Sequence, residues 1–383
     1  MAPALSADCA DDTESLWHAP SVGMRSTDTV LVTGSSGCIG QHIVKMLQEK
    51  DHNSKRIILF DLLPYENNLK HATPKPMKEI QGDLTNAKDV LDACEGVDCV
   101  IHCGALVDIS MFPDAAALEA TNVDGTRNVI DACIKQNVPY LVFTSTTDTV
   151  VSSNHIFYGA ENTTFIPKNF LMGSYAETKY RAEQLVLQAN TRVLSDGVTT
   201  LRTCVLRPTV VYGEEEKHFI PRLMSVAKLY GRGKVQKVKS VDERFQITYA
   251  GNAAYAHVIA KDRLRENSDC AGEIYYITDD TPLEELYVAI KPFVEAQDMR
   301  LSDWSLPYLF AILIMSLISV ILRIIRPIYQ VGKLFPTPAT VTYACTSVFF
   351  NRQKATLRLK YYPCFTPEES YERALEYYKK VKF

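Results

Sequence analysis

The stretch TVLVTGSSGCIGQHIVKMLQEK, residues 29–50, decides the fold of this 383-residue chain. It begins with a short β-branched run, which predicts a buried strand. Gly34, Gly37 and Gly40 follow, and apolar side chains then recur at the spacing of a helix. The order is therefore strand, glycine-rich turn and helix, as in a phosphate-binding βα unit.

The glycines in this turn have a physical role in binding phosphate. They allow a tight turn, close approach of the backbone to a pyrophosphate and close packing of the helix on the strand. The helix N-terminus adds amide groups and the positive end of its dipole. We therefore expect a dinucleotide to lie against Gly34, Gly37, Cys38, Ile39 and Gly40. A tight turn without a ligand is the alternative.

Asp61 indicates which dinucleotide is bound. It ends the next predicted strand, RIILFD (56–61). A carboxylate there accepts hydrogen bonds from both ribose hydroxyls and repels a 2′-phosphate, so it predicts NAD rather than NADP. No arginine occurs in the following DLLPYE segment (61–66), which agrees. The spacing TGxxGxxG resembles that of the extended short-chain dehydrogenases.

Three more strands are predicted downstream. They are MKEIQGDL (77–84), ending at Asp83, DCVIHCGALV (98–107) and PYLVFTST (139–146), with a helix around residues 121–136. Because strands and helices alternate, we expect an α/β fold, a Rossmann-type doubly wound parallel sheet with helices on both faces. The small residues Gly104 and Ala105 would let the backbone lie against the cofactor.

A candidate catalytic pair lies in GSYAETKYRAEQLVLQA (173–189). Tyr175 and Lys179 are four residues apart, so both side chains share one face of a helix. A free tyrosine titrates near pH 10, and we expect the nearby ammonium group to lower this pKa. The tyrosine could then exchange a proton with a substrate oxygen while hydride moves at the nicotinamide. An exposed pair of no function is the alternative.

The second half of the chain resembles a particular family, the 3β-hydroxysteroid dehydrogenase/Δ5-Δ4 isomerases. The matching stretches are LRPTVVYG, YAGNAAYAHVIA, YYITDDTP, WSLPY and RPIY. The resemblance covers roughly residues 28–380, and the last three stretches distinguish the family from sugar-nucleotide epimerases. It implies NAD-dependent oxidation of the 3β-hydroxyl of a steroid or sterol to the 3-ketone.

The resemblance also assigns roles to further residues. Aligned with the family, Thr146 takes the place of the catalytic hydroxyl, with Ser145 as the runner-up and a plain strand end as the alternative. Asp83 would contact the adenine, unless it caps the next helix, which Thr85 or Asn86 could also do. We count Leu84 and Pro208 among the cofactor-binding residues as well.

A second reaction, Δ5-to-Δ4 isomerisation, follows oxidation in the bifunctional family members. The implied acid/base residues are Asp279 or Asp280 with Tyr275 or Tyr276, because a buried carboxyl group of raised pKa can move the acidified proton. The alternative for the aspartates is a helix cap before PLEELYVAI. Glu177 in YAETK, where steroid-converting members have histidine, and an unlike segment at 151–173 leave the particular steroid undecided.

Two other functions compete with this one. A sterol-4α-carboxylate 3-dehydrogenase would form a β-keto acid that loses CO2. A non-catalytic NAD-binding membrane scaffold is the other, although an intact Tyr175, Lys179 and Thr146 argue against it. A formal net charge of −4 gives no basic field for nucleic acid. The ten cysteines include no CxxC pair, and we expect no metal site.

The chain divides into five parts by function. We expect a flexible tail (1–27), an NAD-binding domain (28–210), a substrate-binding part (211–303), an apolar helix (304–326) and a C-terminal part packed on the substrate region (327–383). The last part should end in a helix over TPEESYERALEYYKK, with Thr366 as its cap and Pro367 in its first turn.

The apolar helix lies in SLPYLFAILIMSLISVILRIIRP, which is uncharged from residue 304 to residue 322. It is just long enough to span a bilayer. Ser316, Ser319 and Arg323 fall on one stripe, however, and a span would separate the tail from the NAD site. We therefore expect a helix lying in the membrane surface beside the substrate entrance, with a span and a buried core helix as the alternatives.

These expectations imply partners and a location. The expected partners are a steroid or sterol, membrane lipid and a second copy of the chain in a homodimer, with no nucleic acid. The expected location is the endoplasmic reticulum membrane, with the catalytic domain facing the cytosol, and a mitochondrial membrane is the alternative.

Overall fold

The structure, a computed structural model, describes residues 28–239, 243–326 and 336–382. Residues 1–27, which we expect to form the N-terminal tail, lie outside the described residues. The same holds for residues 327–335 at the start of the C-terminal part.

A seven-stranded sheet forms the centre of the molecule, and every neighbouring pair of its strands is parallel. In spatial order the strands are β11 (Glu273–Ile277), β7 (Arg202–Pro208), β5 (Tyr140–Thr144), β4 (Cys99–His102), β1 (Asp28–Thr33), β2 (Ser54–Asp61) and β3 (Met77–Gln81). The predicted parallel sheet is confirmed, although β3 ends two residues before Asp83.

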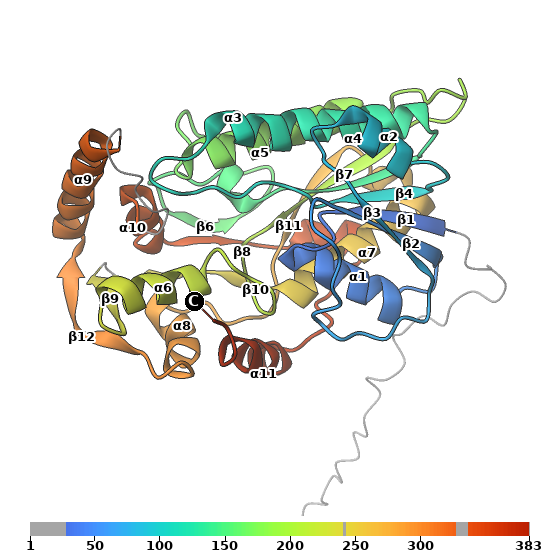
Figure 1. Cartoon of the computed structure of the whole chain (residues 1–383). Helices are drawn as coiled ribbons and strands as arrows, with labels where there is room; N and C mark the ends of the chain where they lie inside the picture. Colours follow the sequence, from blue (N-terminus) through green and yellow to red (C-terminus); the bar gives the residue numbers. More distant parts are fainter. Residues whose placement is uncertain (1–27, 240–242, 327–335, 383) are drawn as a thin grey trace, which may run out of the picture.

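Helices cover both faces of this sheet (Figure 1). On one face lie α1 (Cys38–Glu49) and α7 (Ala250–Glu266); on the other lie α2 (Ala87–Ala93), α4 (Gly125–Lys135) and α5 (Gly173–Ala189). Side chains alternate along a strand, so Val30 and Val32 of β1 pack toward α1 while Leu31 packs in the core of the opposite face. The doubly wound α/β fold follows from this alternation.

The sheet has its topological switch point at β1. The chain passes from β1 to β2 and β3 on one side, and β4, β5, β7 and β11 lie on the other. Ligands of such sheets bind at the carboxyl ends of the strands next to the switch. The turn after β1 and the loop after β4 are therefore the places to look for a site.

A smaller layer stands beyond the carboxyl ends of the strands, around a third core rich in aromatic residues. It contains the helices α6 (Ile220–Tyr230), α8 (Leu286–Glu295), α10 (Pro338–Ala344) and α11 (Pro367–Tyr378). Its two-stranded parallel sheets pair β10 (Ile247–Tyr249) with β8 (Val210–Tyr212), β12 (Arg300–Pro307) with β9 (Lys234–Lys239), and β13 (Val348–Phe350) with β6 (Ile156–Gly159). Residues 211–303 supply part of this layer and also α7 and β11 of the central fold, so the division by function at residue 210 stays a proposal.

The helix ends test several capping expectations. Thr366 caps α11 in a capping box with Glu369, as predicted. Asn86 is the N-cap of α2, which leaves Asp83 free of that role. The alternative role of Asp279 or Asp280 as a helix cap is wrong, because α8 begins only at Leu286.

The apolar helix α9 (Tyr308–Ile325) lies at the edge of the molecule, directly after β12 (Figure 1). Among the described residues it is the one helix long and apolar enough to cross a membrane. Of its residues only Ala311 is buried, so the alternative of a buried core helix is wrong. Leu309, Leu317 and Ile324 are 77%, 60% and 69% exposed.

Candidate active site

A cavity of about 1010 Å³ opens at the carboxyl ends of β1, β4 and β5. This volume is at the upper end of the roughly 300–1,000 Å³ usual for small-molecule sites. The predicted cofactor and catalytic residues on its wall are Gly34, Gly37, Cys38, Ile39, Gly40, Ala105, Thr146, Tyr175, Lys179 and Pro208. Residues separated by more than 170 positions thus share one site.

The glycine turn fits a dinucleotide. Gly34 has a φ of +71°, and a Cβ there would lie 2.5 Å from the Cα of Gly104. A Cβ at Gly40 would overlap the carbonyl oxygen of Gly34, so the first and third glycines let the turn close. Within 4 Å of a Cβ at Gly37 there would be one neighbouring atom, that same oxygen, at 3.3 Å. The second glycine therefore leaves room for a phosphate beside the N-terminus of α1.

Four predicted cofactor-binding residues are not on the cavity wall: Asp61, Asp83, Leu84 and Gly104. Asp61 stands at the end of β2 and accepts hydrogen bonds from the amides of Ser36, at 2.9 Å, and Leu63, at 3.0 Å. Its carboxylate is thus held beside the glycine turn. Each carboxylate oxygen has a further lone pair that can accept a hydrogen bond from a ribose hydroxyl. These contacts fit NAD.

Asp83 and Gly104 support the same rim from behind. Asp83 accepts a hydrogen bond from the amide of Thr85 at 2.8 Å. Gly104 donates its amide to Thr33 Oγ1 at 3.3 Å, and a Cβ there would lie 2.8 Å from the side chain of the buried Leu84. Leu84 and Gly104 therefore pack together under the cavity.

Lys179 is fixed beneath the cavity. Its Nζ donates a 2.7 Å hydrogen bond to the carbonyl oxygen of Thr144 at the end of β5. The same atom lies 4.4 Å from the centre of the Phe143 ring. Burial lowers the pKa of Lys179 to about 8.

The pKa of Tyr175 is shifted in the direction opposite to the one we expected. Burial, and next the charge of Asp148, raise the pKa of its phenol. We expected Lys179 to lower this pKa, and that expectation is wrong for the geometry described here. Desolvation of the buried phenol is the larger cause, and the carboxylate of Asp148 adds to it.

The structure separates the two candidate hydroxyls at the end of β5. Ser145 Oγ donates a 2.7 Å hydrogen bond to Glu183 Oε2, and that carboxylate also pairs with Arg207. Thr146 instead borders the cavity, and its Oγ1 accepts the amide of Asp148 at 3.2 Å. The hydroxyl of Thr146 also donates to the Asp148 carboxylate, so it faces the cavity from within a small polar cluster.

Asp148 and Tyr343 are cavity residues that the sequence did not indicate as functional. Burial raises the pKa of Asp148 to about 6, and hydrogen bonds from Thr146 and Tyr343 partly offset this. Burial and then Asp148 raise the pKa of Tyr343. The acidic residue in TSTTD was a local signal, but Tyr343 of α10 lies 195 positions away and could not be foreseen.

Asn122 was missed for the same reason. It lies in a π-helical turn, η1 (Glu119–Asp124), of the kind that often marks a functional site. Its side chain exchanges two hydrogen bonds with the backbone of Leu106 and donates a third, of 3.1 Å, to Thr178 Oγ1. Asn122 therefore ties the loop after β4 to the helix that carries Tyr175.

The four candidate isomerase residues lie off the cavity wall. Asp279 is buried and accepts hydrogen bonds from the amide of Tyr249, at 2.8 Å, and from Asn252, at 3.0 Å. Asp280 is paired with Arg352. Tyr275 donates to the carbonyl oxygen of Cys270, and Tyr276 contacts Thr164 and Arg207. Each of these side chains has a partner within the fold.

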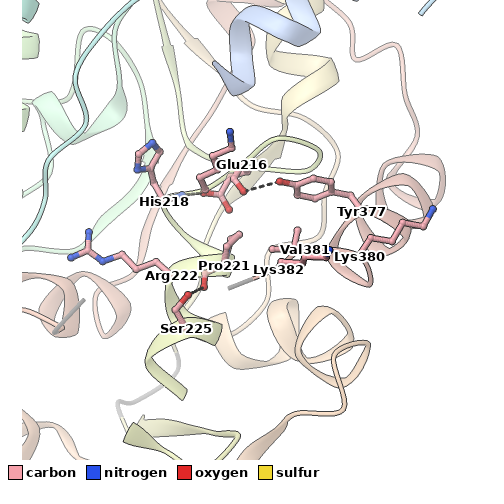
Figure 2. A pocket seen from close by; sticks show the side chains of 10 residues that line it. Glu216, His218, Pro221, Arg222, Ser225, Tyr377, Lys380, Val381 and Lys382 are labelled. Atoms are coloured by element: carbon pink, nitrogen blue, oxygen red, sulfur yellow. Dashed lines mark hydrogen bonds between the residues drawn. The ribbon is translucent and has the colours of Figure 1, made fainter. Parts of the chain in front are cut away.

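A smaller cavity of about 480 Å³ adjoins the large one (Figure 2). Its polar centre is Glu216, whose carboxylate accepts the amides of His218, Phe219 and Ile220 before α6. Burial raises the pKa of Glu216 to about 7. The side chains of Arg222 and Lys380 point in opposite directions in Figure 2, so they do not form a joint anion site.

Comparisons with known proteins identify the family of the chain. Residues 31–308 match the 3-beta hydroxysteroid dehydrogenase/isomerase family. The chain belongs to that family. It is 33% identical over 356 residues to 3 beta-hydroxysteroid dehydrogenase type 7 of Mus musculus, across 91% of this chain and 94% of that protein. It is 29% identical to short-chain dehydrogenase/reductase family 42E member 1 of Xenopus laevis, across 90% and 86%.

Solved structures of the same fold have lower identity. The epimerase Mth375 of Methanothermobacter thermautotrophicus superposes with a TM-score of 0.68 at 16% identity, over 93% of each chain. MoeE5 in complex with UDP-glucuronic acid and NAD gives 0.64 at 19% identity, over 91% of this chain and 98% of that one. At these identities the likeness concerns the fold alone.

Proposed function

We propose that this member of the 3-beta hydroxysteroid dehydrogenase/isomerase family oxidises the 3β-hydroxyl of a steroid or sterol to the ketone with NAD. One observation supports this above the others. The cavity that joins the glycine turn to Tyr175 and Thr146 continues between apolar side chains beyond them. These include Met172, Phe219, Leu223, Val226, Phe245, Leu286 and Met315. An apolar wall next to a hydroxyl-binding pair suits a rigid hydrocarbon that carries one alcohol.

The residues of the chain divide the work of this reaction. The backbone at Gly37 and the N-terminus of α1 hold the pyrophosphate, and Asp61 holds the ribose. Bound NAD supplies a hydride acceptor. Thr146 orients the substrate oxygen, and Tyr175 accepts the proton of that oxygen, with Lys179 below it to carry the charge.

An assay of NADH formation by the purified protein tests this function. The substrates are pregnenolone, a sterol with a long side chain and a 4-carboxysterol, and the control is Tyr175→Phe. We expect NADH from the first two substrates and none from the control. Turnover of the carboxysterol alone would replace our proposal with the decarboxylating dehydrogenase. Absence of NADH with every substrate would favour the scaffold.

Isomerisation stays a prediction, and the positions of the four expected residues do not support it. The same assay addresses it, because a conjugated 3-ketone absorbs ultraviolet light that the unconjugated ketone does not. Residence in the endoplasmic reticulum and a homodimer likewise stay predictions.

We also propose that α9 lies in the surface of a membrane rather than across it. Both ends of the helix contact the folded body: Tyr308 bonds Thr342 of α10 at 3.2 Å, and the guanidinium of Arg326 lies 5.0 Å from the centre of the Phe112 ring. The serines of α9 face the protein, because Ser316 and Ser319 are half-buried, whereas its outer face is entirely aliphatic and aromatic down to Arg323.

The surroundings of α9 favour lipid as the partner of its outer face. Trp304 is 61% exposed just before the helix, and Arg323 and Arg326 are exposed at its end. Lys237 and Lys239 lie on the neighbouring strand β9. An apolar face flanked by tryptophan and basic residues suits the boundary between acyl chains and anionic headgroups.

Membrane fractionation tests this arrangement. We expect the full chain to stay with membranes in alkaline carbonate, and protease to remove a C-terminal tag as readily as it digests the catalytic domain. The double variant Leu313→Lys, Leu317→Lys should become soluble with unchanged thermal stability. A tag protected inside sealed vesicles would indicate a span, and a wild-type protein released by carbonate would exclude both membrane arrangements.

A further inference from the structure

Helix α9 has a second face that the membrane does not explain. Met315 and Ile318 lie on the side turned toward the protein, and both border the large cavity. Tyr175 borders the same cavity at its other end. The helix whose outer face is offered to lipid is therefore also a wall of the active-site cavity.

The rim of the cavity beside α9 comes from the two elements next to it in the fold. Trp304 of β12 lines it on one side and Thr340 of α10 on the other. Trp304 is largely exposed, so its ring is available to the membrane surface as well as to the cavity. Both side chains thus border the cavity beside α9, the helix whose outer face is exposed.

Transfer of a sterol from bilayer to cavity is favoured at such an opening. Exposing apolar surface to water costs about 25 cal/mol per Å². A helix embedded about 5–10 Å into the headgroup boundary lies at a depth where lipid and cavity can meet without water between them. The sterol hydroxyl lies near the same boundary, because it is the polar end of the molecule, so it can enter first and reach Tyr175.

We propose that α9, with Trp304 and Thr340, forms a portal through which sterol passes from the membrane to Tyr175. Met315 and Ile318 contact the aliphatic side chain of the bound sterol at this portal. The proposal rests on the proposed dehydrogenase function and adds its substrate class, membrane-dissolved sterols with a long side chain. A steroid without that side chain leaves the portal residues without a partner.

Paired variants on the two faces of α9 test the portal. Ile318→Trp narrows it, and Leu317→Trp places the same ring on the outer face, where Leu317 is 60% exposed. The substrates are a long-chain sterol in vesicles of neutral and anionic phospholipid, and a 3β-hydroxysteroid without a side chain in buffer. We expect Ile318→Trp to lower kcat/KM for the vesicle sterol about tenfold, as overpacking does, and to leave the soluble steroid near the wild-type value. Leu317→Trp should change neither.

Equal losses for both substrates, or equal losses in both variants, would overturn the portal. A second measurement does not depend on activity. A sterol with a photoreactive group at the end of its side chain, carried in the same vesicles, should label the 308–325 peptide of the wild-type full chain. Excess unlabelled sterol should prevent this, and Ile318→Trp should reduce it. Label elsewhere only would refute the portal, whereas absence of NADH from both substrates together with label on α9 would refute the dehydrogenase function alone.

Discussion

Ser145 Oγ donates a 2.7 Å hydrogen bond to Glu183 Oε2, so its proton already has an acceptor within the fold. Glu183 is fully buried and binds Arg207 through both carboxylate oxygens. Ser145 is therefore part of a buried ion-pair network. The adjacent Thr146 borders the cavity, and we propose that its hydroxyl meets the substrate.

Variants of Thr146 should change kcat, whereas a variant of Ser145 should change the free energy of unfolding. Thr146→Val keeps the side-chain shape but removes the donor, so we expect kcat to fall on the order of 10²–10³-fold. Thr146→Ser should keep most of the activity. Ser145→Ala should keep kcat but lower the free energy of unfolding by about 1.5–3 kcal/mol, because a hydrogen bond to a buried charge is lost. Steady-state kinetics and thermal unfolding measure these effects, and loss of kcat in Ser145→Ala would contradict the assignment.

The pH dependence of oxidation should reflect the buried Tyr175–Lys179 pair. Lys179 carries a proton below its pKa of about 8 and releases it above, and the pKa of Tyr175 is raised. The pair must lose a proton before it can accept one from the alcohol, so kcat/KM should rise with pH and level off above about 8. Arginine stays charged, so Lys179→Arg should lack this inflection.

Asp148 provides a control for the same profile. Its negative charge raises the pKa of Tyr175. Asp148→Asn removes the charge, so the pKa of Tyr175 should fall. The inflection near pH 8 should stay in place, because Cys103 and Glu183, and not Asp148, are the charged groups that act on Lys179. A shift of that inflection would show that Asp148 acts on Lys179 as well.

Local spacing was enough to predict the centre of the site. The strand, turn and helix around Gly34 and the Tyr175–Lys179 pair depend on residues a few positions apart, where helix and strand periods fix the geometry. The sequence could not reveal the contact of Asp148 with Tyr343 or the tie from Asn122 to Leu106 and Thr178. Those contacts depend on tertiary packing between segments that are distant along the chain.

The incorrect expectations have the same origin. Asp279 was expected beside the substrate or at a helix start, and the structure places it against Tyr249 and Asn252. The pKa of Tyr175 depended on how deeply its own phenol is buried and on the nearby Asp148, which spacing alone cannot give.

Asp61 should determine the choice of dinucleotide. Asp61→Asn retains an oxygen for the amide of Ser36 but removes the charge that would repel a 2′-phosphate. We expect the ratio of kcat/KM for NAD to that for NADP to fall about tenfold or more, the effect of roughly 1.4 kcal/mol. Asp83→Asn should weaken both dinucleotides alike. A wild-type enzyme that prefers NADP would refute the role of Asp61.

Variants of Asp279 and Asp280 should differ in the stability of the protein and should leave any isomerisation unchanged. Asp279→Ala leaves the buried amide of Tyr249 without its acceptor and removes one of the two acceptors of the Asn252 side chain, so the free energy of unfolding should fall by about 1–3 kcal/mol. Asp280→Ala breaks an exposed pair with Arg352 and should cost at most about 1 kcal/mol. Urea unfolding measures both. A selective loss of conjugated ketone in either variant would restore the isomerase assignment.

Alanine variants of Gly37 and Gly40 should have different effects, because the first should weaken NAD binding and the second should impair folding. A Cβ at Gly40 would overlap the carbonyl oxygen of Gly34 and the backbone of Ser35, so Gly40→Ala should lower the thermal midpoint or prevent folding. A Cβ at Gly37 meets only the Gly34 oxygen at 3.3 Å, so Gly37→Ala should fold with a thermal midpoint near that of the wild type. The added methyl group would occupy the place of the pyrophosphate, and the Kd for NAD should rise about tenfold or more, because backbone approach to the phosphates is lost. Calorimetric titration with NAD and thermal unfolding compare the two variants directly. Unchanged NAD affinity in Gly37→Ala would mean that the pyrophosphate does not rest on this turn.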